Sequence, residues 1–85
     1  MNHKHKHTLE GIFKKQVSGN IHWHDVESLL EALGAELQTA HGARMTYMLN
    51  GAVGTISKPH RSSVMSKQEV RHLRDFLQTL GVSGP

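Results

Sequence analysis

The fold is decided by residues 45–57, which read MTYMLNGAVGTIS. Apolar and polar side chains roughly alternate on both sides of Asn50-Gly51, as is typical of strands with one buried face. Asn-Gly is the strongest short hairpin signal, because both residues accept the positive φ angles of a two-residue turn. The pattern therefore predicts antiparallel strands over 45–49 and 52–57.

A third strand is expected over 35–39, with a turn at His41-Gly42 joining it to the hairpin. Upstream of it, residues 23–33 predict an amphipathic helix, and Gly34 is the expected stop. Its apolar stripe consists of Trp23, Val26, Leu29, Leu30 and Leu33. Trp23 could stack on a nucleic-acid base, but its place on this stripe favours core packing.

A second long helix is expected downstream of the hairpin, after a loop over 61–65. Ser66 and Glu69 have the spacing of a capping box, in which each side chain satisfies a free backbone N–H of the first turn. An apolar face follows, and Gly81 is the expected end. This face consists of Val70, Leu73, Phe76, Leu77 and Leu80.

A short extra helix is predicted over 8–14, with Thr8 as its N-cap. Residues 1–7 are expected to form a flexible basic tail, and 82–85 a loose one. The chain is thus expected to be a single α+β domain over 1–85. Its order is a short helix, a helix, a three-stranded antiparallel sheet and a helix, with the two long helices covering one face of the sheet.

The amino-acid composition excludes several classes of protein and of site. The chain has 85 residues and no cysteine, which excludes disulfides and thiolate metal sites. Its apolar runs are far shorter than the roughly 20 residues that span a bilayer. Residues 1–7 read MNHKHKH with no apolar run behind them, so no signal peptide is expected. We therefore expect a cytoplasmic protein that is not inserted in a membrane.

The charge is unevenly placed along the chain. Ten Lys and Arg against seven Asp and Glu give a net charge of +3, but the basic residues gather before residue 16 and after residue 57, while 21–57 is acidic. Such asymmetry suggests a polyanion on one surface and a different partner on another. Ordinary solvated lysines are the alternative interpretation.

Eight histidines add a pH-dependent charge. His3, His5 and His7 alternate with lysines, which suggests either a metal-binding tail or a basic tail that helps to hold RNA. A tail without acidic or thiolate partners is a poor specific metal site, so the RNA interpretation is favoured and no metal or cofactor is expected.

The order of elements resembles the double-stranded-RNA-binding-domain (dsRBD) fold. The local sequence resembles one branch of the HicA family of toxin–antitoxin systems over essentially the whole chain. The matching stretches, in order, are KHKHTLEGIF (4–13), IHW (21–23), LLEALGAE (29–36), GAR (42–44), KPH (58–60) and VRHLRDFL (70–77).

This resemblance implies a small ribonuclease that cleaves messenger RNA and is neutralised by a HicB antitoxin in a hetero-oligomer. The family's Gly-Ser-His motif, which carries its catalytic histidine, falls here on Gly42-Ala43-Arg44. An arginine stays charged at ordinary pH and cannot act as a general base, although it can bind a phosphate through two hydrogen bonds. The resemblance therefore supports RNA binding and an antitoxin partner better than it supports cleavage.

Three residues are the candidate catalytic site. His60 follows the third strand where the family also tends to carry histidine, and His41 precedes Gly42 in the turn. Either could transfer protons during metal-free RNA cleavage, while Arg44 binds the phosphate. The alternative is that His60 merely caps the end of the third strand.

Basic residues after the sheet are the candidate RNA-binding set. Lys67, Arg71 and Arg74 fall at i, i+4 and i+7 on one face of the predicted helix, opposite the apolar face. Together with the two cations that precede the helix, they could follow a phosphate backbone or be an ordinary solvated face. The full set is Lys58, Arg61, Lys67, Arg71 and Arg74.

Two rival functions remain. A non-catalytic module that binds structured RNA by shape is favoured by Arg44 in place of the family's histidine. A histidine-rich metal carrier is supported only by the N-terminal tail. Toxicity on expression would distinguish the ribonuclease from both rivals. Metal in the purified protein would identify the metal carrier.

Overall fold

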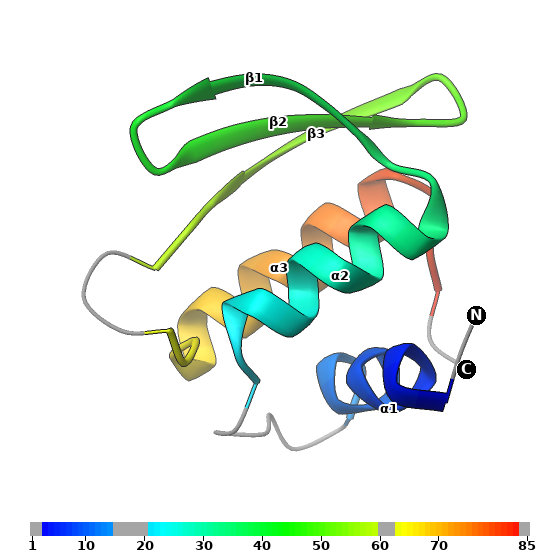
Figure 1. Cartoon of the computed structure of the whole chain (residues 1–85), viewed down its shortest axis with the longest axis vertical. Helices are drawn as coiled ribbons and strands as arrows, with labels where there is room; N and C mark the ends of the chain where they lie inside the picture. Colours follow the sequence, from blue (N-terminus) through cyan, green and yellow to red (C-terminus); the bar gives the residue numbers. More distant parts are fainter. Residues whose placement is uncertain (1–2, 15–20, 60–62, 84–85) are drawn as a thin grey trace.

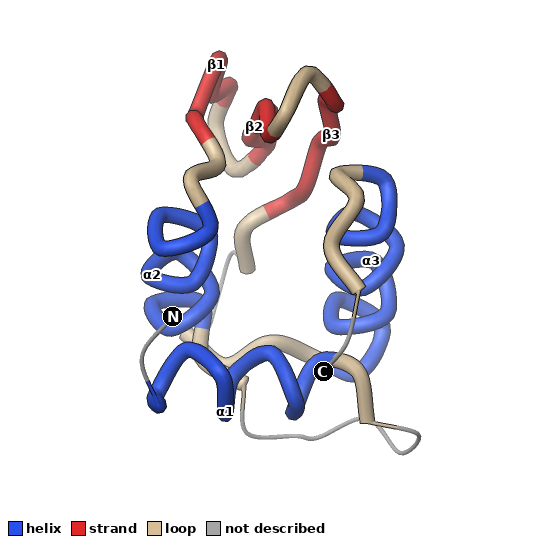
Figure 2. Tube along the Cα trace, turned by 90° about the vertical axis from the view of Figure 1, so that its right-hand side faces the viewer, coloured by secondary structure: helices blue, strands red, loops and turns tan. Residues whose placement is uncertain are grey.

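The computed structural model describes residues 3–14, 21–59 and 63–83. In chain order the elements are α1 (His3–Ile12), α2 (Trp23–Leu33), β1 (Glu36–His41), β2 (Arg44–Leu49), β3 (Ala52–Ser57) and α3 (Lys67–Thr79). The strands form one antiparallel sheet in the order β1-β2-β3. α2 and α3 lie beneath one face of this sheet, and α1 lies across their far side (Figures 1 and 2). The predicted dsRBD-like α+β arrangement is confirmed.

The hairpin of β2 and β3 has the predicted turn. Asn50 and Gly51 both have positive φ, 51° and 84°, and Leu49 pairs directly with Ala52. The turn between β1 and β2 lies one residue later than predicted. Gly42 and Ala43 form it, because Gly42 supplies the positive φ of 61° and His41 already pairs with Arg44. β1 accordingly spans 36–41 and not 35–39, with an irregularity in its register between Leu37 and Thr39.

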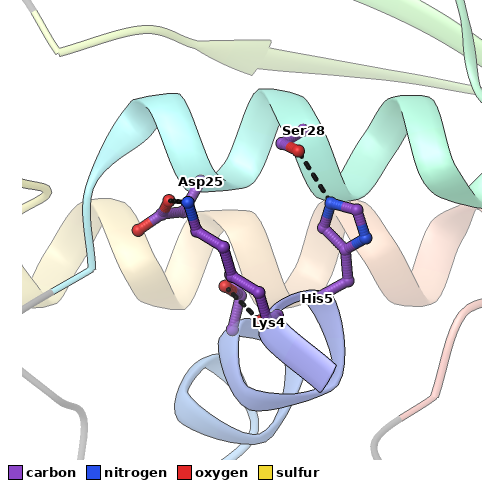
Figure 3. Close-up of polar contacts among 5 residues, drawn as sticks. Lys4, His5, Asp25 and Ser28 are labelled. Atoms are coloured by element: carbon purple, nitrogen blue, oxygen red, sulfur yellow. Dashed lines mark hydrogen bonds and ion pairs between the residues drawn. The ribbon is translucent and has the colours of Figure 1, made fainter. Parts of the chain in front are cut away.

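α1 begins at His3, five residues before the predicted start, so the expectation of a flexible tail is wrong for residues 3–7. The reason is a pair of contacts with α2 that sequence periodicity does not show. His5 Nε2 lies 2.7 Å from Ser28 Oγ, and Lys4 Nζ lies 3.5 Å from Asp25 Oδ1 (Figure 3). Thr8 is therefore not an N-cap, and its hydroxyl donates to the carbonyl of Lys4 within the helix.

Both long helices have the predicted bounds and signals. Gly34 ends α2 in the left-handed conformation, with φ at 89°. Ser66 and Glu69 form the capping box at the start of α3. The two helices are also joined at their starts, since Trp23 N donates to Ser63 O at 2.7 Å and Met65 N donates to Ile21 O at 2.8 Å. These two hydrogen bonds tie the start of α2 to the segment that leads into α3.

One hydrophobic core joins the three layers. It includes Ile12 of α1, Leu29 and Leu30 of α2, and Leu73 and Leu77 of α3, all at most 1% exposed. Trp23 is 4% exposed within this core, so the packing interpretation is confirmed. Val82, expected in a loose tail, packs against the core and donates its N–H to the carbonyl of Leu77.

α3 packs closely against β3 because Gly54 has no side chain. A Cβ built on Gly54 would lie 2.8 Å from Cδ1 of Phe76, so only glycine leaves room for the ring in this position. The Phe76 ring also contacts the Tyr47 ring edge-on, with centroids 6.0 Å apart. Such a contact favours one orientation of the two rings and so fixes α3 against β2 and β3.

We predict that Tyr47 makes the protein sensitive to alkali. Burial, together with the negative charge of Glu27, raises the pKa of the Tyr47 hydroxyl above its ordinary 10.0. The folded state then holds this proton more tightly than the unfolded chain, so the free energy of unfolding should fall as pH rises from about 10 through the folded pKa. Urea unfolding of wild type and Tyr47→Phe across this range measures the effect. Equal slopes of stability against pH for the two proteins would contradict the prediction.

Candidate nucleic-acid interface

Antiparallel pairing gathers basic residues at one end of the sheet. His41 and Arg44 face each other across the β1–β2 turn, and Arg44 also pairs with Ser57 of β3. The backbone N–H of Lys58 donates to the carbonyl of Ala43 at 2.8 Å, which ties the end of β3 to the same turn. We call His41, Arg44 and Lys58 the basic sheet end.

The alternation of the strands sets the direction of Arg44. Tyr47 and Leu49 of β2 are buried against the helices, so Arg44, Thr46 and Met48 lie on the opposite face. Residues directly paired across an antiparallel sheet share a face, so His41 and Ser57 lie on the same open face as Arg44. All three are exposed, and no described element covers this face (Figure 1).

A row of threonines lies next to the basic sheet end on this open face. Thr46 pairs with Thr39 on one side and with Thr55 on the other, and its hydroxyl lies 3.1 Å from that of Thr55. Threonine hydroxyls commonly contact phosphate and sugar oxygens in nucleic-acid complexes. Sequence reasoning missed this row, because its members become neighbours only once the register of all three strands is known.

Two of the predicted site residues, His60 and Arg61, lie outside the described residues. The described chain leaves the sheet at Lys58-Pro59 and continues at Ser63. The described part of the candidate catalytic site is therefore His41 with Arg44. Arg44 can neutralise a phosphate, and His41 is the group beside it that can exchange a proton.

The three predicted RNA-binding cations of α3 differ in their exposure and in their contacts. Lys67 and Arg71 are exposed, and the first turn of α3 lies on the same side of the molecule as the end of β3 (Figure 1). Arg74 is half-buried and donates from Nε to the carbonyl of Ile12 at 3.1 Å and from Nη2 to that of Lys14 at 2.8 Å. Arg74 thus holds the end of α1, a structural role that the helical spacing alone did not indicate.

The histidines at the start of α1 are separated by the helix. His5 turns toward α2, whereas His3 and His7 are exposed one turn apart on another face. Among the residues that the structure describes, no three His, Cys, Asp or Glu side chains are grouped so that they could hold a metal ion. A hollow of about 260 Å³ beside α1 is lined by His7, Thr8, Glu10, Gly11, Lys14, Ile21 and Asp25, away from the basic sheet end.

Within the described ranges, no helix is both long and apolar enough to cross a membrane.

No family model, curated protein or solved structure matches this chain. The function therefore has to be inferred from the arrangement of the chain's own residues. That arrangement is an open sheet face with an exposed arginine and histidine at one end, an exposed lysine just after β3, and two further exposed cations at the start of α3.

We predict that Arg74→Gln lowers the free energy of unfolding by about 1–2 kcal/mol, because it removes two charge-assisted hydrogen bonds to the end of α1. Arg71→Gln is the matched control. It removes an exposed arginine from the same helix and should change stability by less than about 0.5 kcal/mol. Urea unfolding followed by circular dichroism measures both. Equal, small effects would show that the Arg74 contacts do not hold α1.

Proposed function

We propose that this protein is a HicA-like toxin, a ribonuclease that acts on messenger RNA and is neutralised by a HicB-like antitoxin. The observation that carries the proposal is the convergence of His41, Arg44 and Lys58 at one end of the sheet, with His41 and Arg44 on its uncovered face. The resemblance of the sequence stretches to HicA proteins supports it, as does the dsRBD-like arrangement of the elements.

Metal-free RNA cleavage fits the residues at hand. The 2′-hydroxyl oxygen attacks phosphorus and forms an O–P bond, while the bond from phosphorus to the 5′-oxygen breaks. A base takes the hydroxyl proton and an acid protonates the leaving oxygen, roles that suit histidine, and His41 and His60 are the candidates. Arg44 would bind the phosphate and stabilise the charge that develops on it.

The antitoxin would cover the basic sheet end. A partner that presents acidic side chains there would compete with RNA for Arg44, Lys58 and the first turn of α3, where Lys67 and Arg71 are exposed. The antitoxin would then inhibit the ribonuclease by occupying the surface that binds RNA. The active toxin would accordingly be the free chain, and the stored form a hetero-oligomer in the cytoplasm.

A second candidate function is a non-catalytic RNA-binding module of the same fold. Arg44 favours it, because the family's catalytic histidine is replaced there by a group that holds its proton. Such a module would use the same open face and the same cations. It would differ from the toxin only in leaving bound RNA intact.

Expression of this chain alone in bacteria tests the proposal. We predict growth arrest with fragmented messenger RNA, and relief of both by Arg44→Gln and by His60→Ala. His24→Ala, which removes an exposed histidine of α2, is the matched control and should remain toxic. Normal growth with intact RNA and abundant folded protein would reject the ribonuclease and leave the binding module.

RNA binding itself has an expected salt dependence. Each phosphate contact releases counterions and contributes about 0.7 to 0.9 to the slope of log affinity against log salt concentration. We predict that Lys67→Gln with Arg71→Gln makes this slope shallower by about 1.4 to 1.8 if both cations touch phosphates. Fluorescence anisotropy of a labelled RNA at several salt concentrations measures it. A slope unchanged from wild type would remove α3 from the interface.

A further inference from the structure

A second basic surface lies on α1. His3, Lys6 and His7 are exposed at positions i, i+3 and i+4 of this helix and therefore share one face. Lys14, just past the helix end, is also exposed and lines the same hollow as His7. We call these four residues the α1 basic face.

This face is separate from the basic sheet end. Leu9 and Ile12 of α1 are buried against the helical layer, and α1 lies on the side of that layer away from the sheet (Figure 2). The helical layer therefore stands between the two basic surfaces. A nucleic acid bound at the sheet end alone would leave α1 uncovered.

The charge pattern of α1 is the reverse of what stabilises a free helix. Its first turn contains no acidic residue, and its first five positions are all His or Lys. Cations near the positive end of the helix dipole are unfavourable, whereas a bound anion there is stabilising. Lys4 forms an ion pair with Asp25 of α2, whereas the residues of the α1 basic face are exposed.

Both acidic and basic groups face the two histidines of this surface. Glu10 of α1 lines a shallow depression together with His3, Lys6 and His7, and it opposes their charge. From α2, Asp25 lines the hollow that contains His7. From α3, Arg74 reaches only the far end of α1, at the carbonyls of Ile12 and Lys14.

We infer that the α1 basic face binds the phosphate backbone of RNA at a second contact. Lys6 and Lys14 supply positive charge on this face, and the exposed rings of His3 and His7 can donate hydrogen bonds to phosphate oxygens. The inference rests on the proposed function in one respect, namely that the polyanion is RNA.

The test is fluorescence anisotropy of a labelled single-stranded RNA oligonucleotide with the full chain at several salt concentrations. The triple variant His3→Gln, Lys6→Gln, His7→Gln removes one charge and two ring donors, so it should lose about tenfold in affinity. Its salt slope should be shallower by about 0.7 to 0.9, the contribution of the phosphate contact of Lys6. His24→Gln with His72→Gln removes two exposed histidines from other helices and should behave as wild type.

A second variant guards against loss of folding in the triple one. Glu10→Gln removes the opposing charge and leaves every cation in place, so its RNA affinity should rise about two- to threefold, a gain that unfolding could not produce. Equal affinity of wild type, triple variant and Glu10→Gln would overturn the inference.

The outcomes also separate this inference from the proposed function. Loss of binding in Arg44→Gln, with the triple variant unchanged, would leave the RNA-binding function standing and reject the α1 contact. Loss of binding in the triple variant, with growth unaffected by expression of the wild type, would support the α1 contact and reject the toxin. No binding of RNA by wild type would overturn both.

Discussion

The close packing of Phe76 against Gly54 is the constraint on which the other layers of the molecule depend. It lets α3 approach β3 so closely that a single methyl group on the strand would collide with the ring. The same helix holds α1 on its other side through the two hydrogen bonds from Arg74. α3 thus connects the sheet with the N-terminal helix, and a shift of α3 would disturb both. In a chain of 85 residues the core is thin, so the loss of one close contact is costly.

Placing all helices on one side of the sheet determines what the other side can do. Alternate residues of β2 must point away from the core, and they include Arg44, Thr46 and Met48. The tight turn at Gly42-Ala43 then brings His41 beside Arg44, and the hydrogen bond from Lys58 draws the end of β3 to the same place. An exposed surface of cations and hydroxyls therefore follows from the strand register.

Exposed basic residues gather in two parts of the molecule. One group lies at the β1–β2 turn and the start of α3, and the other follows α1. Between them, the acidic residues of α2 include Asp25, which pairs with Lys4 and so helps to attach α1. The uneven distribution of charge along the sequence thus becomes a distribution over two surfaces. A long polyanion could contact both surfaces, whereas one compact partner would cover only one.

The sequence by itself determined the elements that local rules specify. The Asn50-Gly51 turn, the capping box at Ser66 and the stop at Gly34 each depend on backbone preferences of a few neighbouring residues, so all three could be predicted. It also placed His41 and Arg44 near one turn. Only the tertiary structure decided that residues 3–7 are helical, that Arg74 holds α1, and that three threonines form a row. Each of these depends on partners between 7 and 62 positions away in the chain, through contacts such as His5 with Ser28, Arg74 with Ile12, and Thr39 with Thr46. Periodicity cannot show such contacts, because it reports which face of an element is apolar and not what lies opposite that face.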